Sequence, residues 1–335
     1  MSKNETQVLK GVAILMMLWL HLFLNLDVAK SCINFLYIGD VPFSHILTKA
    51  CKPVSIFLIL GGYGLYCVYI KGNDKRRFSR IFKLYVHYWI VFALFVPVVF
   101  FLSPKGIIMN TLSIFIKSIT AYNTLWNTPC WFLLPYSILS ISYPFLFRLL
   151  DKYDIKLTLV VIILIEIVQT QCYLSYQSFF KGHAILMLIN NISGYIEPFI
   201  LGAIIRKYCL IERLKNTTNS FQWKSPVVLV ILIFIIALKC STSFFYLSIY
   251  ELSFIILFLL VNRSKKIDGF LMFFGKHSMN IWMIHHMIYF YFSDLTYSPK
   301  YPILIWIGLV LTSLLSSYLV NFISKQIGKI IPIKY

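Results

Sequence analysis

The stretch "LKGVAILMMLWLHLF", from Leu9 to Phe23, is an apolar segment with a lysine near its start and a histidine near its end. Lys10 and His21 are 11 residues apart, which on an α-helix is within about 20° of three whole turns. The two side chains therefore share one helix face, roughly 16 Å apart along the axis. An ionisable ring inside an apolar helix predicts a functional site, because placing it in hydrocarbon is costly.

The whole chain has the composition of a membrane protein. It has 335 residues, of which 59% are hydrophobic and 13% are charged, and its mean hydropathy is +0.78. Apolar runs long enough to cross a bilayer recur along it, and the short alternating segments of an outer-membrane barrel do not occur. We predict an all-α polytopic membrane protein, a bundle of about ten transmembrane helices. Residues 1–335 are expected to form a single integral-membrane domain, with no soluble domain.

The predicted spans follow the apolar runs of the sequence. They cover about residues 8–26, 53–70, 82–102, 131–149, 156–174, 184–205, 225–240, 244–262, 270–292 and 303–323. A further apolar segment, 107–122, is interrupted by polar residues, and counting it as a crossing would place the basic segment 148–156 on the wrong side. We interpret 107–122 as an amphipathic or re-entrant piece at the outer interface.

The distribution of basic residues sets the predicted orientation. With the N-terminus inside, 23 of the 31 lysines and arginines fall in inner segments, including all seven arginines. This bias follows the positive-inside rule, so both termini are expected in the cytoplasm. The net charge of +19 then reflects topology, and no nucleic-acid partner is expected, because the basic residues are spread over short loops. The seven cysteines include no CxxC pair, so no metal site is expected.

A second candidate feature is the basic segment "KGNDKRRFSRIFKLY", from Lys71 to Tyr85. Arg77 and Arg80 are three residues apart, so they share a face where the third span begins. Guanidinium groups bind phosphates through two parallel hydrogen bonds. Lys10 is predicted at the same membrane level, so the three charges together suit a polyphosphate. The alternative is a basic loop that only sets topology.

A third candidate is "GKHSMNIWMIHHMIYFY", from Gly275 to Tyr291, which places two histidines deep in the ninth predicted span. Only one of two adjacent histidines on a helix usually faces the bundle interior. We therefore expect one of His285 and His286 to face the bundle interior. A position at the outer interface is the alternative for the other. His285 is the second catalytic candidate, and a structural role for both rings is the alternative.

Three carboxylates, Glu166, Glu197 and Glu251, also fall in predicted spans. Each must be paired, protonated or placed in a wet cavity. Any of them is able to orient His21 or His285 by accepting an N–H bond, as carboxylates do for catalytic imidazoles. A structural hydrogen bond between helices is the alternative for each, and the sequence does not decide between them.

These segments, taken in order, resemble the integral-membrane acyltransferase 3 family. The run from Lys10 to His21 resembles the family's Arg-x10-His signature, and Arg77 with Arg80 resembles its cytoplasmic Arg-x-x-Arg motif. The segment "FGKHSMNIWMIHH" resembles the family's late Gly-x-x-Ser-x-x-Ile-Tyr-x-x-His helix, with His285 at the last position of the motif.

Two further helices complete the resemblance, which covers nearly the whole chain. "IFLILGGYGL" (56–65) and "WFLLPYSILSISYPFLF" (131–147) resemble the family's second helix and its Trp-x-Leu helix. The chain departs from the family pattern at four places, one of them Gly61, which stands where serine is common. Lys10 replaces the usual arginine, Trp282 replaces a tyrosine, and the helix after Trp131 lacks a carboxylate that many members carry.

The resemblance implies an O-acyltransferase of the bacterial cytoplasmic (inner) membrane. Such an enzyme moves an acyl group, usually acetyl, from cytoplasmic acyl-CoA to a hydroxyl of a cell-surface polysaccharide or of its lipid-linked precursor. Lys10, Arg77 and Arg80 are then expected to bind the phosphates of acetyl-CoA, which is the donor substrate and not a permanently bound cofactor. His21 is expected to act as general base or as acyl carrier. The expected partners are acyl-CoA, the glycan acceptor and membrane lipid.

A proton- or solute-coupled transporter or a glycan exporter is the alternative class of function. Buried histidines and carboxylates and proline-kinked helices suit a transporter. Such a protein predicts internal repeats, and none is visible in this sequence. A glycan exporter has no need of the register between Lys10 and His21.

Overall fold

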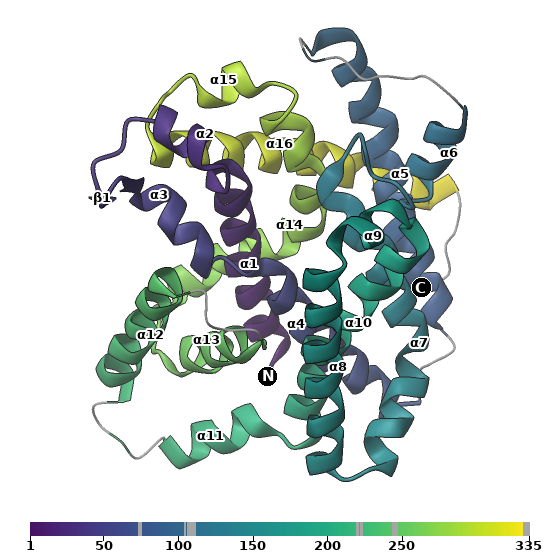
Figure 1. Ribbon diagram of the computed structural model, residues 1–335, viewed down its shortest axis with the longest axis vertical. Helices are drawn as coiled ribbons and strands as arrows, with labels where there is room; N and C mark the ends of the chain where they lie inside the picture. Colours follow the sequence, from purple (N-terminus) through teal and green to yellow (C-terminus); the bar gives the residue numbers. More distant parts are fainter. Residues whose placement is uncertain are drawn as a thin grey trace. The chain divides into compact units, whose positions relative to one another are not determined.

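The computed structural model describes residues 1–72, 76–103, 105, 112–218, 221, 224–242 and 247–330. These residues are almost wholly α-helical (Figure 1), which confirms the predicted all-α class. The contacts within the chain divide it into two compact units, each assembled from three stretches of sequence. Unit 1 comprises Met1–Leu9, Lys52–Arg77 and Pro135–Gly269, and unit 2 comprises Lys10–Cys51, Phe78–Leu134 and Phe270–Tyr335.

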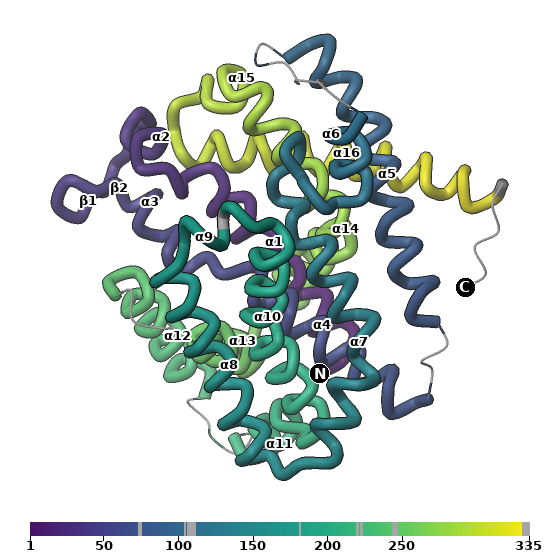
Figure 2. The backbone as a smooth tube through the Cα atoms, turned by 45° about the vertical axis from the view of Figure 1, so that its right-hand side comes forward, coloured from purple at the N-terminus to yellow at the C-terminus, as the bar shows by residue number. Residues whose placement is uncertain are grey.

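Unit 1 is built around α10, which packs against α4 and α8 (Figures 1 and 2). Its helices are α4 (Pro53–Tyr69), most of α7 (Leu133–Lys152), α8 (Ile155–Ser175), α9 (Gln177–Gly182), α10 (Ala184–Lys207), α11 (Leu210–Thr218), α12 (Lys224–Ser241) and α13 (Ile249–Leu260). The backbones of α4 and α10 approach closely, because glycines stand at their crossing. A Cβ added at Gly62 would overlap the carbonyl oxygen of Phe199, and one added at Gly202 would overlap that of Ile59. Small residues at helix crossings are the usual means of close packing in membrane proteins.

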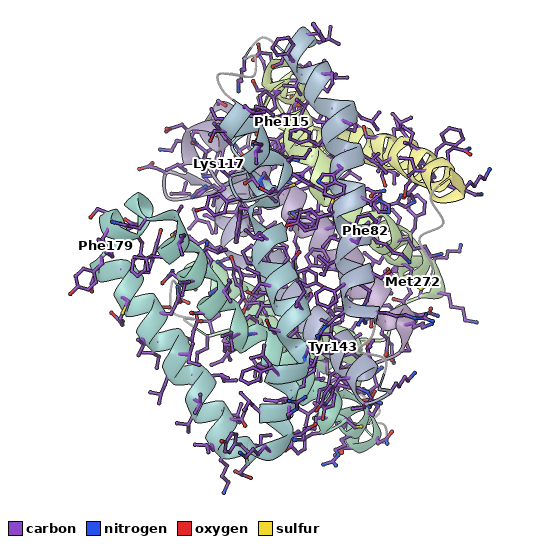
Figure 3. All side chains as sticks on the ribbon, turned by 90° about the vertical axis from the view of Figure 1, so that its right-hand side faces the viewer. Phe82, Phe115, Lys117, Tyr143, Phe179 and Met272 are labelled. Carbon is purple, nitrogen blue, oxygen red and sulfur yellow. The ribbon has the colours of Figure 1, made fainter. Side chains whose placement is uncertain are left out.

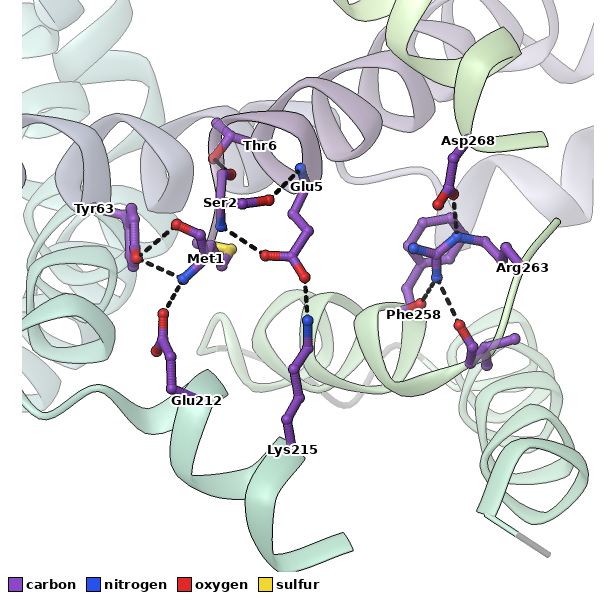
Figure 4. Close-up of polar contacts among 11 residues, drawn as sticks. Met1, Ser2, Glu5, Thr6, Tyr63, Glu212, Lys215, Phe258, Arg263 and Asp268 are labelled. Carbon is purple, nitrogen blue, oxygen red and sulfur yellow. Dashed lines mark hydrogen bonds and ion pairs between the residues drawn. The ribbon is translucent and has the colours of Figure 1, made fainter. Parts of the chain in front are cut away.

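Polar contacts tie the start of the chain to α11 within unit 1 (Figure 4). The ammonium group of Met1 contacts Glu212 and donates a hydrogen bond to the hydroxyl of Tyr63 at 2.6 Å, and Lys215 pairs with Glu5. Burial alone would raise the pKa of Glu212, but the hydrogen bond from the ammonium group and the nearby positive charges outweigh it and lower the pKa. These contacts fix α11 beside a part of the chain that is predicted to be cytoplasmic.

Unit 2 is built from α1, α5, α14 and α16. Its elements are α1 (Lys3–Phe23), α2 (Leu26–Ser31), β1 (Tyr37–Ile38), β2 (Val41–Pro42), α3 (Phe43–Ile46), the 3₁₀ helix η1 (Leu47–Ala50), α5 (Arg77–Leu102), α6 (Leu112–Ile119), the 3₁₀ helix η3 (Thr128–Phe132), α14 (Lys265–Tyr289), α15 (Ser293–Tyr297) and α16 (Pro302–Ile330). The first residues of α1, α5 and α14 belong to unit 1. The two short strands pair antiparallel, with Tyr37 opposite Pro42. The apolar core of unit 2 joins α5, α14, α16 and residues 121–133, and includes Tyr88, Met283 and Val320.

Eight helices of the described part of the chain are long and apolar enough to cross a membrane. They correspond to eight of the predicted spans. The other two are α13, which has 12 residues, and α14, which has 25 residues and an N-terminal third rich in polar groups. Residues 243–246, where the eighth predicted span begins, lie outside the described residues. The structure therefore shows a multi-pass helical protein, and the predicted count of about ten crossings stays a prediction.

The segment predicted not to cross the membrane, 107–122, contains the eight-residue helix α6, and residues 107–111 lie outside the described residues. At 1.5 Å per residue α6 is about 12 Å long, far short of the roughly 30 Å hydrocarbon core. Tyr85, Tyr88 and Trp89, near the middle of α5, donate hydrogen bonds to the carbonyl groups of residues 118–120 at the end of α6. Figure 3 shows Phe115 and Lys117 of α6 beside α5. This position favours a re-entrant segment over one that lies on the membrane surface.

Candidate active site

The helix that carries Lys10 and His21 packs closely against α14 at a glycine. A Cβ added at Gly11 would overlap the backbone carbonyl of Leu271, so only glycine permits this approach of α1 to α14. α1 is continuous from Lys3 to Phe23, which confirms that Lys10 and His21 lie on one helix. Their predicted separation of roughly 16 Å along the axis follows from the helical rise.

Unit 2 brings His21 and His285 together. The centres of their rings are 5.0 Å apart, although the two residues come from opposite ends of the sequence. Tyr289 lies against both rings, with its centre 6.1 Å from that of His21 and 5.9 Å from that of His285. No hydrogen bond joins His21, or the hydroxyl of Tyr289, to another residue of the described chain. Three ionisable or polar rings therefore meet at one place, with hydrogen-bonding groups that remain available to a ligand.

The hydrogen bonds of His285 fix which of its nitrogens carries the proton. Its side chain is fully buried, and Nδ1 lies 3.1 Å from the carbonyl oxygen of Ile281 and 2.7 Å from that of Trp282. Both neighbours are acceptors, so Nδ1 must be the donor and Nε2 carries the lone pair in the neutral ring. Nε2 is buried and has no hydrogen-bond partner among the described residues. A neutral imidazole with a fixed tautomer and an unused lone pair is suited to accept a proton or a hydrogen bond.

The sequence left open whether a carboxylate orients His285. Backbone carbonyl groups of α14, and not a glutamate, accept the N–H bond of His285. Glu166, Glu197 and Glu251 all belong to unit 1, whereas His21 and His285 belong to unit 2. Glu166 and Glu251 instead line a polar pocket of unit 1, and Glu197 accepts hydrogen bonds from Ser248 in its wall.

His286 is buried among aromatic side chains. His286 is only 4% exposed, so both adjacent histidines are buried within unit 2. Its ring stacks on that of Phe290 at 4.9 Å and meets the edge of Tyr291 at 5.9 Å. Lys105 lies over the ring of Phe290. These aromatic side chains pack around the C-terminal end of α14.

The charged candidates are divided between the two units. Lys10 is half-buried, and no ion pair or hydrogen bond joins it to another described residue, which is unusual for an ammonium group within an apolar helix. Arg77 and Arg80 are half-buried at the start of α5, with Arg77 in unit 1 and Arg80 in unit 2. The joint binding of one polyphosphate by these three residues stays a prediction.

A set of hydrogen bonds that fixes α14 beside His285 was not predicted from the sequence. Asn127 donates a hydrogen bond to the carbonyl oxygen of Met283 at 2.7 Å, and Trp282 donates one to the carbonyl oxygen of Pro129 at 3.0 Å. The hydroxyl of Tyr291 bonds to the carbonyl oxygen of Trp126 at 3.1 Å. The segment 126–130 thus holds α14 on both sides of His285. The signal in the sequence was the break "WNTP" within an apolar region, where a turn forms in place of a helix.

A family model described as an acyltransferase domain matches residues 4–322 of the chain. The match covers both units, and it includes α1 with Lys10 and His21, the start of α5, and α14 with His285. No curated protein and no solved structure matches the chain.

Proposed function

Because this chain belongs to the acyltransferase 3 family, we propose that it is a membrane O-acetyltransferase. The proposed reaction moves an acetyl group from cytoplasmic acetyl-CoA to a hydroxyl of a cell-surface polysaccharide or of its lipid-linked precursor. The observation that carries the proposal is the meeting of His21 and His285 on a helix pair that also holds Lys10. A helix with a charge near one end and a reactive ring near the other suits a long donor with a charged head and a reactive tip.

The proposed donor site lies at the predicted cytoplasmic end of α1 and α5. Lys10, Arg77 and Arg80 would bind the phosphates of acetyl-CoA through charge-assisted hydrogen bonds. The absence of a described ion-pair partner for Lys10 supports this role, because a ligand anion would supply the missing negative charge. The pantetheine arm would then extend along α1 and bring the thioester to His21.

In the proposed chemistry, His21 removes the proton from the acceptor hydroxyl as the oxygen attacks the thioester carbonyl. A C–O bond forms, the C–S bond breaks, and the leaving thiolate of CoA takes the proton from the His21 imidazolium. His285 would stabilise that imidazolium, because its Nε2 lone pair is unused and its tautomer is fixed. The hydroxyl of Tyr289 would donate a hydrogen bond to the oxyanion that develops on the carbonyl.

A second route within the same proposal makes His21 the acyl carrier. His21 would attack the thioester itself and release CoA, and the acetyl-imidazole would then pass its acetyl group to the acceptor hydroxyl. The lack of a hydrogen bond on His21 within the described chain leaves its ring available for this attack. Rapid quenching with radiolabelled acetyl-CoA and no acceptor would separate the routes, since only the carrier route leaves label on the protein.

The proposed location is the bacterial cytoplasmic membrane, with both termini in the cytoplasm as the positive-inside rule predicts. The test of function is direct. Purified protein in lipid nanodiscs would be given acetyl-CoA with candidate glycans, and thiol release and the mass of each glycan would be measured. Acceptor-dependent thiol release with one added acetyl group is the expected result. Thiol release that continues beyond one equivalent per protein without acceptor, or no release with any hydroxylated acceptor, would overturn the proposal.

A further inference from the structure

Unit 1 contains a pocket of about 300 Å³ that the proposed chemistry does not use. It lies where α4 begins, α12 ends and α13 begins, and its inner wall is formed by the middle of α8 and α10. The charge distribution predicts this end of the three helices on the outer side of the membrane. The volume is at the lower end of the range of about 300–1,000 Å³ typical of small-molecule sites.

The wall of the pocket is polar to a degree that membrane-spanning helices rarely show. Glu251 and Lys239, each 6% exposed, line it with little access to water, and the buried Glu197 contacts its wall through Ser248. Glu197 accepts hydrogen bonds from the backbone N–H and the hydroxyl of Ser248. Burying such groups in an apolar surrounding is costly, and they are usually kept for a binding or transport role.

One carboxylate of the wall has hydrogen-bonding capacity that no described residue uses. The Oε2 atom of Glu166 is buried, and it has no hydrogen-bond partner in the structure. Gln169, one turn further along α8, also faces the pocket. Gly194 leaves the space that the Gln169 amide occupies, because a Cβ there would lie 3.1 Å from its Oε1 atom. Glu166 and Gln169 of α8 thus line the same cavity.

The mixture of groups decides what chemistry the pocket fits. Lys52 and Lys239 would repel a metal cation, and the described chain brings no three His, Cys, Asp or Glu side chains close enough to hold one. Glu166 and Glu251 would repel a phosphate or carboxylate ligand. A hydroxyl group both donates and accepts, so a ligand with several hydroxyls satisfies amides, carboxylates and ammonium groups together. Tyr195 adds an aromatic side chain to the wall.

We propose that this pocket binds a sugar residue of the acceptor glycan. The inference rests on the proposed function and adds to it the class of acceptor group and the residues that select it. Glu166 and Gln169 supply the selective hydrogen bonds. Binding on the predicted outer side would separate the site of acceptor recognition from the cytoplasmic donor site.

The test uses two glutamines of α8 as a matched pair. Gln169 lines the pocket, whereas Gln171 is exposed on the same helix. Full-length protein in nanodiscs, free of glycoside detergents, would be titrated with the methyl glycosides of glucose, mannose and N-acetylglucosamine. Saturation-transfer NMR would measure the binding of each glycoside. Tetrahydropyran-2-methanol keeps the ring with a single hydroxyl and serves as the control ligand.

At least one methyl glycoside is expected to bind, and the control ligand is not. Gln169→Leu and Glu166→Gln should each weaken that binding about tenfold or more, as loss of a hydrogen bond to a charged or fixed group does. Gln171→Leu should leave it within about twofold. Gly194→Val, which displaces Gln169, should abolish it. Unchanged acetyl-CoA binding in each variant would verify that the protein is folded.

The outcomes separate this inference from the proposed function. If the parent protein transfers acetyl and both Gln169→Leu and Gly194→Val keep its kcat/KM for the glycan, the pocket is not the acceptor site and the function stands. If the parent binds a glycoside through Gln169 but transfers no acetyl group, the sugar site stands and the acetyltransferase proposal fails. If none of the three glycosides binds, the inference is overturned.

Discussion

Replacing His285 with asparagine tests the fixed tautomer of the histidine pair. The Asn amide nitrogen takes the place of Nδ1 and can still donate to the carbonyl groups of Ile281 and Trp282. The variant therefore keeps the local hydrogen bonding but removes Nε2, the buried atom that has no partner in the described structure. Any loss of activity would then report the missing lone pair and not a collapsed helix.

The expected loss of turnover in His285→Asn follows from the role assigned to Nε2. If it accepts a hydrogen bond from the His21 imidazolium in the transition state, that bond to a charged group contributes about 1.5–3 kcal/mol. The expected fall in acetyl transfer is then roughly 10- to 150-fold, with affinity for acetyl-CoA nearly unchanged. The control is His277→Asn on the same helix, where Nδ1 lies 2.9 Å from the hydroxyl of Ser317.

The assay is steady-state transfer at saturating acceptor, with acetyl-CoA affinity measured in parallel by calorimetry. His285→Asn should lose turnover while His277→Asn stays within about threefold of the parent. If His285→Asn turned over as fast as the parent protein, its lone pair would have no part in catalysis. Equal losses in both variants would mean that polar contacts along α14 matter only for folding.

Three further predictions concern the neighbourhood of this pair. Tyr289→Phe should reduce turnover about 10²–10³-fold if its hydroxyl stabilises the oxyanion. The control Tyr291→Phe removes only a hydrogen bond to the Trp126 carbonyl and should change thermal stability, not turnover. Equal turnover of Tyr289→Phe and the parent would exclude the oxyanion role of Tyr289. Gly11→Ala should destabilise the protein by about 1–3 kcal/mol, measured by thermal unfolding in detergent, because the new methyl group overlaps the Leu271 carbonyl; an unchanged melting temperature would contradict the close approach of α1 and α14. Replacing Arg77 and Arg80 together with alanine should weaken acetyl-CoA binding by about 10- to 150-fold per residue, and calorimetry that shows parental affinity would identify the segment as a topology signal only.

The sequence predicted the parts of the site that depend on one helix. Helical periodicity alone places Lys10 and His21 on a common face, and α1 is continuous through both residues. The pattern of apolar runs likewise predicted the helical class, and eight of the ten predicted spans are helices of membrane-spanning length among the described residues. In these cases local geometry and hydropathy determine the outcome, and no knowledge of neighbouring helices is needed.

The parts that depend on contacts between distant helices were not predictable in this way. The motif made His285 a candidate, but its contact with His21 depends on how α1 packs on α14, which a close glycine contact at Gly11 decides. The role of Tyr289 follows only from that packing. The same reason explains why Glu166 was considered as a partner of the histidines, whereas it belongs to the pocket of unit 1.

The central claim is that His21 performs the chemistry of acetyl transfer. The most direct measurement is a paired one on His21→Ala, namely its affinity for acetyl-CoA and its turnover with the acceptor. The account predicts that affinity stays within a few-fold of the parent, because the phosphates would be held roughly 16 Å away along α1. Turnover should fall by a factor of about 10² or more, the usual contribution of a positioned base. Full turnover in His21→Ala would contradict the account.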